Sequence, residues 1–307
     1  MNLCFIVEDC YRLDTMPLAV ARRLAEWGHD VDVFEPANAL SRVSELFREN
    51  RHDAWVLKSV SDGPGLSLLE AAAASGVRTI NDARAVRPVR DKAIAAAIAR
   101  RRSLPFPLTY FAAVPELLRT VPAEHYPLVV KPANGSSGRG VRLVNSPAEL
   151  AARLGAGGEG WLLAQSYVAN PGVDIKVYDT GGELHATVQR SPLHPDVLVD
   201  TQTVALPDEL AELVTDVGKA FNLDLYGVDV VEGPEGWVVV DVNDFPSFTS
   251  VPDAAARVAR TVLRLAAEGR SEPVGSLLAG GPVDLSIPAP RWAETVAVDV
   301  CSGAVRQ

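Results

Sequence analysis

Two polar residues, Asp241 and Asn243, interrupt an otherwise apolar strand pattern in WVVVDVND (237–244). Because side chains alternate between the faces of a strand, Val239, Asp241 and Asn243 are expected on one face. Asp229 lies in the preceding strand pattern, and the turn GPEG would bring it beside Asp241 in a hairpin. Carboxylate and amide oxygens are the ligands that Mg²⁺ prefers, and an unpaired carboxylate is costly to bury. The spacing therefore predicts a magnesium site, with turn capping as the alternative role of these side chains.

A second candidate site lies in KPANGSSGRG (131–140), where Lys131 ends a strand pattern and a glycine-rich loop follows. Such a loop can turn backbone N–H groups and hydroxyls toward an anion. The groups that it offers are Gly135, Ser136, Ser137, Gly138 and Gly140. The loop lacks the GK[ST] ending of a P-loop, and the first strand-to-helix turn lacks a dinucleotide fingerprint. A nucleotide bound with Mg²⁺ is the prediction, and a flexible turn is the alternative.

The charge of the chain limits its partners. The net charge of −10 over 307 residues argues against a nucleic-acid or membrane surface, because both require clustered positive charge. Only five of the 29 basic residues are lysines, and four of these stand at expected strand ends or at a helix start: Lys58, Lys92, Lys131 and Lys176. The N-terminus has neither a basic region nor a long apolar run, so a cytoplasmic location is expected.

The order of elements predicts a mixed fold, α/β followed by α+β. Strand and helix patterns alternate over the first 85 residues, which is typical of a parallel sheet. A helix over 87–101, with Asp91 in its first turn, and an extended segment follow, and then come strand patterns of an antiparallel sheet. We expect four parts, with the last a tail without a readable motif: residues 1–87, 88–164, 165–268 and 269–307.

The series of motifs from residue 88 to residue 268 resembles the ATP-grasp superfamily. It comprises DK (Asp91, Lys92), PFPLT, VVKP, the glycine-rich loop, LLAQSYV, GVD and DVND, in that order. The resemblance implies a Rossmann-like pre-ATP-grasp domain at 1–87 and ATP held between two α+β subdomains. It implies Lys92 and Lys131 on the phosphates, the loop 134–140 as a lid, and adenine contacts along Gln165, Ser166, Tyr167 and Val168. Asp229, Asp241 and Asn243 would hold Mg²⁺ or Mn²⁺.

Two branches of this superfamily match different parts of the chain. RimK-like carboxylate–amine ligases usually carry glutamate at the position of Asp241, in an E-V-N run. A D-x-N run followed by F-P is instead similar to the inositol 1,3,4-trisphosphate 5/6-kinases. In those kinases the matching lysines and arginine bind the acceptor, which implies an acceptor site of Lys58, Asn134, Lys176, Arg190 and Ser247. Asn134 stands where the kinases have a histidine, and a surface pair is the alternative for Lys176 and Arg190.

The function expected first is a ligase that uses ATP and Mg²⁺. A carboxylate clamped by Lys176 and Arg190 would attack the γ-phosphate, and an amine would capture the acyl phosphate. The alternatives are a kinase that phosphorylates a polyol and a non-catalytic ATP-binding regulator. The acceptor would be a small molecule or a peptide, and the alanine- and arginine-rich composition indicates a bacterial source. The sequence leaves the oligomeric state open, with a homodimer among the options.

Overall fold

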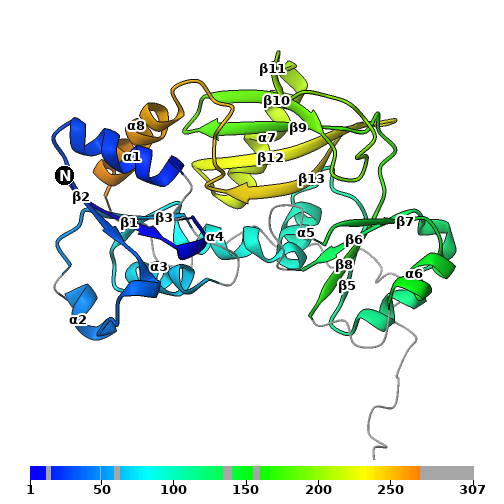
Figure 1. The fold of residues 1–307 in the computed structure, drawn as a ribbon, viewed down its shortest axis with the longest axis horizontal. Helices are drawn as coiled ribbons and strands as arrows, with labels where there is room; N and C mark the ends of the chain where they lie inside the picture. The colour runs from blue at the N-terminus through cyan, green and yellow to red at the C-terminus, as the bar shows by residue number, and fades with distance from the viewer. Residues whose placement is uncertain (12–14, 49, 59–62, 134–139, 155–159, 270–307) are drawn as a thin grey trace, which may run out of the picture. The chain divides into compact units, whose positions relative to one another are not determined.

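Three sheets organise the chain in this computed structural model (Figure 1). The structure describes residues 1–11, 15–48, 50–58, 63–133, 140–154 and 160–269. None of the helices in these ranges is long and apolar enough to cross a bilayer. The order of the described elements is the expected one, with parallel α/β elements first and antiparallel sheets after them. The mixed fold is therefore confirmed, while the division into four parts stays a prediction.

The N-terminal sheet is parallel, with the strand order β2-β1-β3-β4. Its strands are β1 (Asn2–Val7), β2 (Asp30–Phe34), β3 (Ala54–Lys58) and β4 (Arg78–Ile80). Its helical segments are η1 (Asp9–Tyr11), α1 (Thr15–Glu26), η2 (Pro36–Asn38), α2 (Val43–Arg48) and α3 (Pro64–Ala74). Strands β1 and β3 are apolar on both faces because helices cover both: α1 packs on one face and α3 on the other.

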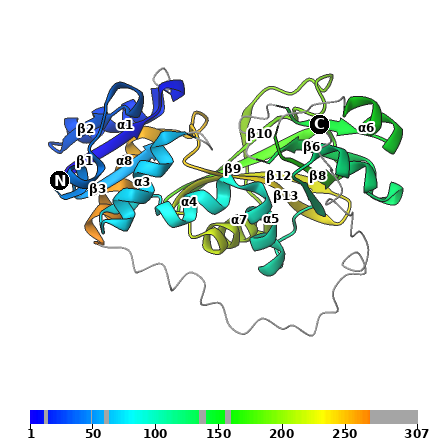
Figure 2. The same ribbon diagram turned by 90° about the horizontal axis from the view of Figure 1, so that it is seen from below.

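Helix α8 (Ala254–Ala267), which comes last in the described chain, also packs on this first sheet. Its residues Val258, Val262 and Leu265 share a core with Leu3, Phe5 and Val7 of β1, and it lies beside α1 (Figure 2). The amphipathic helix expected over 252–268 is thus present, and its apolar face is buried against the N-terminal strands.

Two helices occupy the stretch where the sequence predicts one. Helix α4 (Ala83–Arg90) ends at Asp91, and α5 (Lys92–Arg101) begins directly after it. The expectation that Asp91 and Lys92 open a helix is confirmed, because the Asp91 carboxylate accepts from the backbone of Ala93 and Ile94. The start of that helix at residue 87 is wrong, since the residues before Asp91 belong to a separate helix. The break places Lys92 in the first turn of α5.

The second sheet is small and antiparallel, with the order β5-β8-β6-β7. Its strands are β5 (Thr109–Ala112), β6 (Leu128–Pro132), β7 (Arg142–Val144) and β8 (Leu162–Ser166). The helical segments η3 (Pro115–Thr120), η4 (Ala123–His125) and α6 (Pro147–Arg153) accompany it. The core of this sheet contains Leu118, Leu128 and Leu150.

The third sheet is antiparallel and has the order β11-β10-β9-β12-β13. Its strands are β9 (Val173–Thr180), β10 (Leu184–Arg190), β11 (Gln202–Val204), β12 (Leu225–Gly233) and β13 (Gly236–Asp244). Helix α7 (Asp208–Phe221) packs Val214 and Val217 against one face, together with residues of α4 and α5. The other face is left for polar side chains.

A β-bulge changes the face on which the residues of β13 lie. Asp229 pairs with Asp241, but the next residue, Val230, pairs with Val239, so Val240 is an extra residue. Val239 is buried in the core, while Asp241 and Asn243 line a cavity on the opposite side. The expectation that Val239 shares a face with Asp241 is therefore wrong, since strict alternation assumes a regular strand.

The side chain of Asn81 ties the start of β12 to the end of β4. Its Nδ2 donates to the carbonyl of Leu225 at 2.7 Å, and its Oδ1 accepts from the N–H groups of Asp224 and Leu225 at 3.0 and 2.9 Å. Asn81 is only 2% exposed, so water cannot replace these bonds. The amide of Asn81 thus provides hydrogen-bond partners for the backbone at the point where the third sheet meets the first.

Replacing Asn81 with alanine is expected to lower the free energy of unfolding by at least about 2 kcal/mol, because three buried hydrogen bonds to the backbone are lost. Urea denaturation followed by circular dichroism measures the change. Asn145→Ala removes an exposed amide and should change stability by less than about 0.5 kcal/mol. Equal effects of the two substitutions would contradict this role of Asn81.

Candidate functional site

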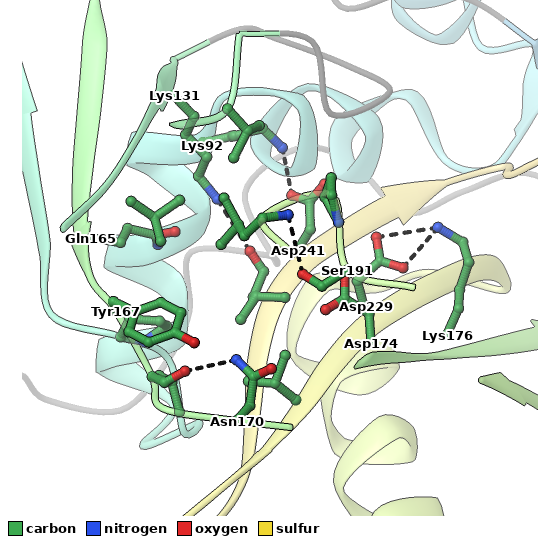
Figure 3. Close-up of a pocket in the computed structure, with 18 of the residues that line it drawn as sticks. Lys92, Lys131, Gln165, Tyr167, Asn170, Asp174, Lys176, Ser191, Asp229 and Asp241 are labelled. Atoms are coloured by element: carbon green, nitrogen blue, oxygen red, sulfur yellow. Dashed lines mark hydrogen bonds and ion pairs between the residues drawn. The ribbon is translucent and has the colours of Figure 1, made fainter. Parts of the chain in front are cut away.

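A cavity of about 490 Å³ is lined by residues of both antiparallel sheets and by Lys92 at the start of α5 (Figure 3). The small sheet contributes Val129, Lys131 and Gln165, and the large sheet contributes the polar face left open by α7. Charged side chains from both sheets and from α5 converge on this cavity. They include Lys92, Lys131, Asp174, Lys176, Asp229 and Asp241.

Three charged residues form a row across the large sheet. Lys176 of β9 pairs in register with Asp229 of β12, which pairs with Asp241 of β13. The ammonium of Lys176 donates to both oxygens of Asp229, at 2.8 and 3.2 Å, and Asn243 Nδ2 donates to Asp229 Oδ2 at 3.1 Å. Burial lowers the pKa of Lys176, but Asp229 outweighs it, and the net effect is a raised pKa. Lys176 therefore stays charged at neutral pH.

The negative charge of Asp241 is compensated by Lys92, which reaches it from α5. The Nζ of Lys92 lies 2.5 Å from Asp241 Oδ1, and the backbone N–H of Lys92 donates to Ala133 at the end of β6. Burial alone would raise the pKa of Asp241, but Lys92 and Lys131 together hold it below its ordinary value. Asp241 is therefore an ionised carboxylate that faces a cavity rich in cations.

Lys131 is the most strongly perturbed cation of the cavity. It is 8% exposed, and its Nζ donates to the carbonyl of Val240 at 3.1 Å. Burial lowers the pKa of Lys131 to about 8, although the Asp241 carboxylate favours the charged form. The acceptor is the carbonyl of the extra residue in the bulge, so the bulge also positions Lys131.

The segment expected to contact adenine lines the cavity, but several of its groups already have partners. Gln165 is 5% exposed and donates through Nε2 to Thr109 Oγ1 at 2.9 Å. The backbone N–H groups of Ser166 and Tyr167 donate to Leu108 and Pro127. The Tyr167 hydroxyl contacts His194 Nε2 at 2.8 Å. The segment therefore lines the cavity, and its contact with adenine stays a prediction.

Most of the residues expected from the sequence are brought together. The structure places the following around one cavity: Lys92, Lys131, Gln165, Ser166, Tyr167, Val168, Lys176, Arg190, Asp229, Asp241 and Asn243. The guanidinium of Arg190 donates to the carbonyl of Pro195, and Arg190 also lines a second hollow before β11. Asn134, Gly135, Ser136, Ser137 and Gly138 lie outside the described residues. Gly140 has φ of 76°, a conformation that favours glycine at the end of this loop.

Two expected acceptor residues, Lys58 and Ser247, lie outside the cavity lining. Lys58 is 7% exposed, donates to the carbonyl of Phe245 at 2.9 Å and lies 4.8 Å from the centre of the Tyr11 ring. Ser247 is half-buried in the turn that follows β13. Phe245 adopts a positive φ of 41°, which is unusual for a bulky residue. Lys58 therefore helps to hold this turn, and its contact with an acceptor stays a prediction.

Asp174 and Ser191 belong to the cavity but were not expected from the sequence. Asp174 is 8% exposed; burial raises its pKa, and the Ser191 hydroxyl opposes this shift by a hydrogen bond. The signal was present in VDIK (173–176), since alternation along β9 puts Asp174 on the same face as Lys176. A buried carboxylate in this place suits a ligand that carries hydroxyl or amine groups.

The expected metal ligands have the right chemistry for a hard divalent cation. Asp229 and Asp241 are directly paired, and the amide of Asn243 contacts Asp229. Within the described part of the chain, no group of three or more His, Cys, Asp or Glu side chains is arranged for a metal. Two carboxylates and an amide leave coordination positions for water and phosphate oxygens, which is how Mg²⁺ is usually held. The donor set therefore fits Mg²⁺.

Comparisons with known proteins identify the class. The two antiparallel sheets and the cavity between them define an ATP-grasp fold. A RimK domain ATP-grasp protein from Sphaerobacter thermophilus has a TM-score of 0.69 and 22% identity, over 85% of this chain and 99% of the other. The ATP-grasp ligase PsnB, in complex with the precursor peptide PsnA2 and AMPPNP, has a TM-score of 0.63 and 17% identity, over 86% of this chain and 97% of the other.

The family follows from the sequence comparisons. The model of the RimK-like ATP-grasp domain matches residues 89–264, more than half of the chain. The chain belongs to the RimK-like ATP-grasp family. A relative named as a probable alpha-L-glutamate ligase, from Haemophilus influenzae, is 25% identical over 264 residues, which cover 75% of this chain and 87% of the relative.

The family membership confirms that the chain is an ATP-grasp enzyme of the ligase type, which forms C–N bonds. Enzymes of this class use ATP and a divalent metal ion. The finding favours the ligase over the polyol kinase, although Asp241 and the F-P turn depart from the usual ligase motif. The aspartate is therefore a variation within the ligase branch.

The lowered pKa of Lys131 predicts a pH-dependent affinity for ATP. Because only the charged ammonium attracts phosphate, affinity for MgATP should fall by up to about ten-fold as the pH rises through about 8 toward 9. Isothermal titration calorimetry with AMPPNP measures this dependence. In Lys131→Arg the guanidinium stays charged, so its affinity should not decline over this range. The same decline in both proteins would contradict the assignment.

Proposed function

We propose that the enzyme joins a carboxylate to an amine through an acyl phosphate, with release of ADP and phosphate. The observation that carries the proposal is the charge balance of the cavity. Among the residues that the structure describes, four cations line it, Lys92, Lys131, Lys176 and Arg190, against the three carboxylates Asp174, Asp229 and Asp241. Together with one divalent metal ion, these cations suit the ATP phosphates and a substrate with few negative charges, such as a single carboxylate. A polyphosphorylated inositol would require many more cations.

ATP and Mg²⁺ fit the end of the cavity where β13 meets α5. Asp229, Asp241 and Asn243 would hold the metal, and Lys92 and Lys131 would contact the phosphates. A bound Mg²⁺ would neutralise the negative charge that develops on the phosphoryl oxygens. The Asp91 cap fixes the backbone at the start of α5, and the ammonium of Lys92 contacts Asp241 in the cavity lining.

The acceptor carboxylate fits beside Lys176 and Arg190. Its oxygen would attack the γ-phosphate and form the acyl phosphate, and the amine would then displace phosphate and give up a proton. A Cβ at Gly227 would lie 3.2 Å from Pro246 and 3.6 Å from Lys176, so the turn after β13 closely approaches this end of the cavity. Pro246 would then form a wall that excludes water from the acyl phosphate.

An amino acid or a peptide is the acceptor class that we propose. The relative from Haemophilus influenzae is named for glutamate, and PsnB was solved with a precursor peptide. Both substrates carry a carboxylate and an amine, the two groups that the proposed reaction joins. Asp174 would receive the amine or hydroxyl groups of a ligand in the same cavity.

Phosphate release tests the reaction type. With MgATP, free phosphate should appear only when both a carboxylate and an amine from an amino-acid and peptide panel are present. Hydroxylamine in place of the amine should give a hydroxamate, since it traps the acyl phosphate. Asp241→Asn should lower turnover by at least about 100-fold while the circular dichroism spectrum is unchanged. A new phosphomonoester signal in ³¹P NMR without free phosphate would identify a kinase instead.

Lys176→Ala is expected to raise the KM for the carboxylate substrate by at least about ten-fold, because a charge-assisted contact is lost. The KM for ATP, measured at saturating Mg²⁺, should change by less than about three-fold. Lys219→Ala removes an exposed lysine that contacts Asp216 and serves as the control. Equal increases in both KM values would assign Lys176 to the nucleotide.

A further inference from the structure

A second ion pair joins the elements that carry the phosphate and metal ligands. Arg90 NH2 lies 2.9 Å from Asp244 Oδ2, and the two side chains are 9% and 6% exposed. Arg90 is the last residue of α4, and Asp244 is the last residue of β13. Neither residue lines the cavity.

Stability alone does not account for this pair. Two charges lose their hydration when they are buried, and apolar side chains of the same volume are often at least as stable. The Nε of Arg90 is also buried without a hydrogen-bond partner among the described residues. An incompletely satisfied buried ion pair is therefore better explained by the geometry that it imposes.

The geometry concerns one proposed phosphate ligand, Lys92, and one proposed metal ligand, Asp241. Lys92 comes two residues after Arg90, and Asp241 comes three residues before Asp244. Lys92 and Asp241 form their own ion pair, at 2.5 Å, so two links connect the junction of α4 and α5 with the end of β13. Both side chains of the inner link face the cavity, whereas the outer link is buried behind it.

When a nucleotide binds, the outer ion pair can persist but the inner ion pair cannot. If the function proposed above holds, Lys92 turns to the phosphates and Asp241 to the metal, so the inner pair separates. We propose that Arg90 and Asp244 are positioning residues. Their ion pair holds the start of α5 against the end of β13 while Lys92 and Asp241 give up their mutual contact and bind MgATP. Without the outer pair, these two ligands would lose their relative position at the moment of binding.

The double substitution R90M/D244L separates positioning from stability. It fills the site with apolar side chains of similar length, so thermal unfolding should occur at or above the wild-type temperature. Its affinity for AMPPNP with Mg²⁺, measured by calorimetry, should nevertheless fall by about ten-fold. The single variant D244N keeps the size of the side chain and should weaken binding in the same direction.

The control pair lies on the same helix. Arg87 of α4 forms an exposed ion pair with Glu70 of α3, away from the cavity, so Glu70→Gln should bind AMPPNP like wild type. Wild-type affinity in R90M/D244L would overturn the proposal, as would a loss of affinity that only follows a loss of folded protein. Absence of AMPPNP binding by the wild type would overturn it as well. Because AMPPNP binding needs no acceptor, a failed search for carboxylate and amine substrates would refute the proposed reaction and leave this test intact.

Discussion

The carboxylates of Asp229 and Asp241 face each other on paired strands, and each needs a cation close by. Lys176 reaches Asp229 from within the same sheet, whereas Lys92 reaches Asp241 from α5 and Lys131 adds its charge from the small sheet. Mutual repulsion of the two acids is thereby balanced by elements that are distant in the sequence. The requirement for charge compensation holds α5, the small sheet and the large sheet around one cavity.

The bulge at Val240 helps to place the Asp241 carboxylate among the cations of the cavity. In a regular strand, Val239 and Asp241 would share a face, so either the valine would leave the core or the acid would enter it. One extra residue lets Val239 stay buried and Asp241 face the cavity. The carbonyl of that extra residue also accepts a hydrogen bond from the ammonium of Lys131. The bulge thus allows one strand to contribute both to the apolar core and to the charged cavity.

The charged residues at the strand ends could be predicted because their signals are local. Alternation with a period of two indicated the acidic residues, and the scarcity of lysine indicated the lysines. Lys92, Lys131, Lys176, Asp229, Asp241 and Asn243 were found in this way, and the structure brings them together. The bulge could not be predicted, because it depends on pairing between two strands and not on either strand alone. The start of a helix at Asp91 and Lys92 could be read from the sequence, but the separate helix α4 before it was not predicted. Asp174 was missed although its alternation with Lys176 was readable.

The packing of α8 on the N-terminal sheet bears on how such a chain can be shortened or recombined. The family match begins at residue 89, which suggests a natural place to exchange the preceding segment. Yet Val258, Val262 and Leu265 of α8 complete the core around β1, so the apolar stripe of this helix depends on strands from the opposite end of the chain. A chimaera with a new N-terminal segment must therefore also replace α8 with a matching helix, because α8 and the N-terminal strands share one core.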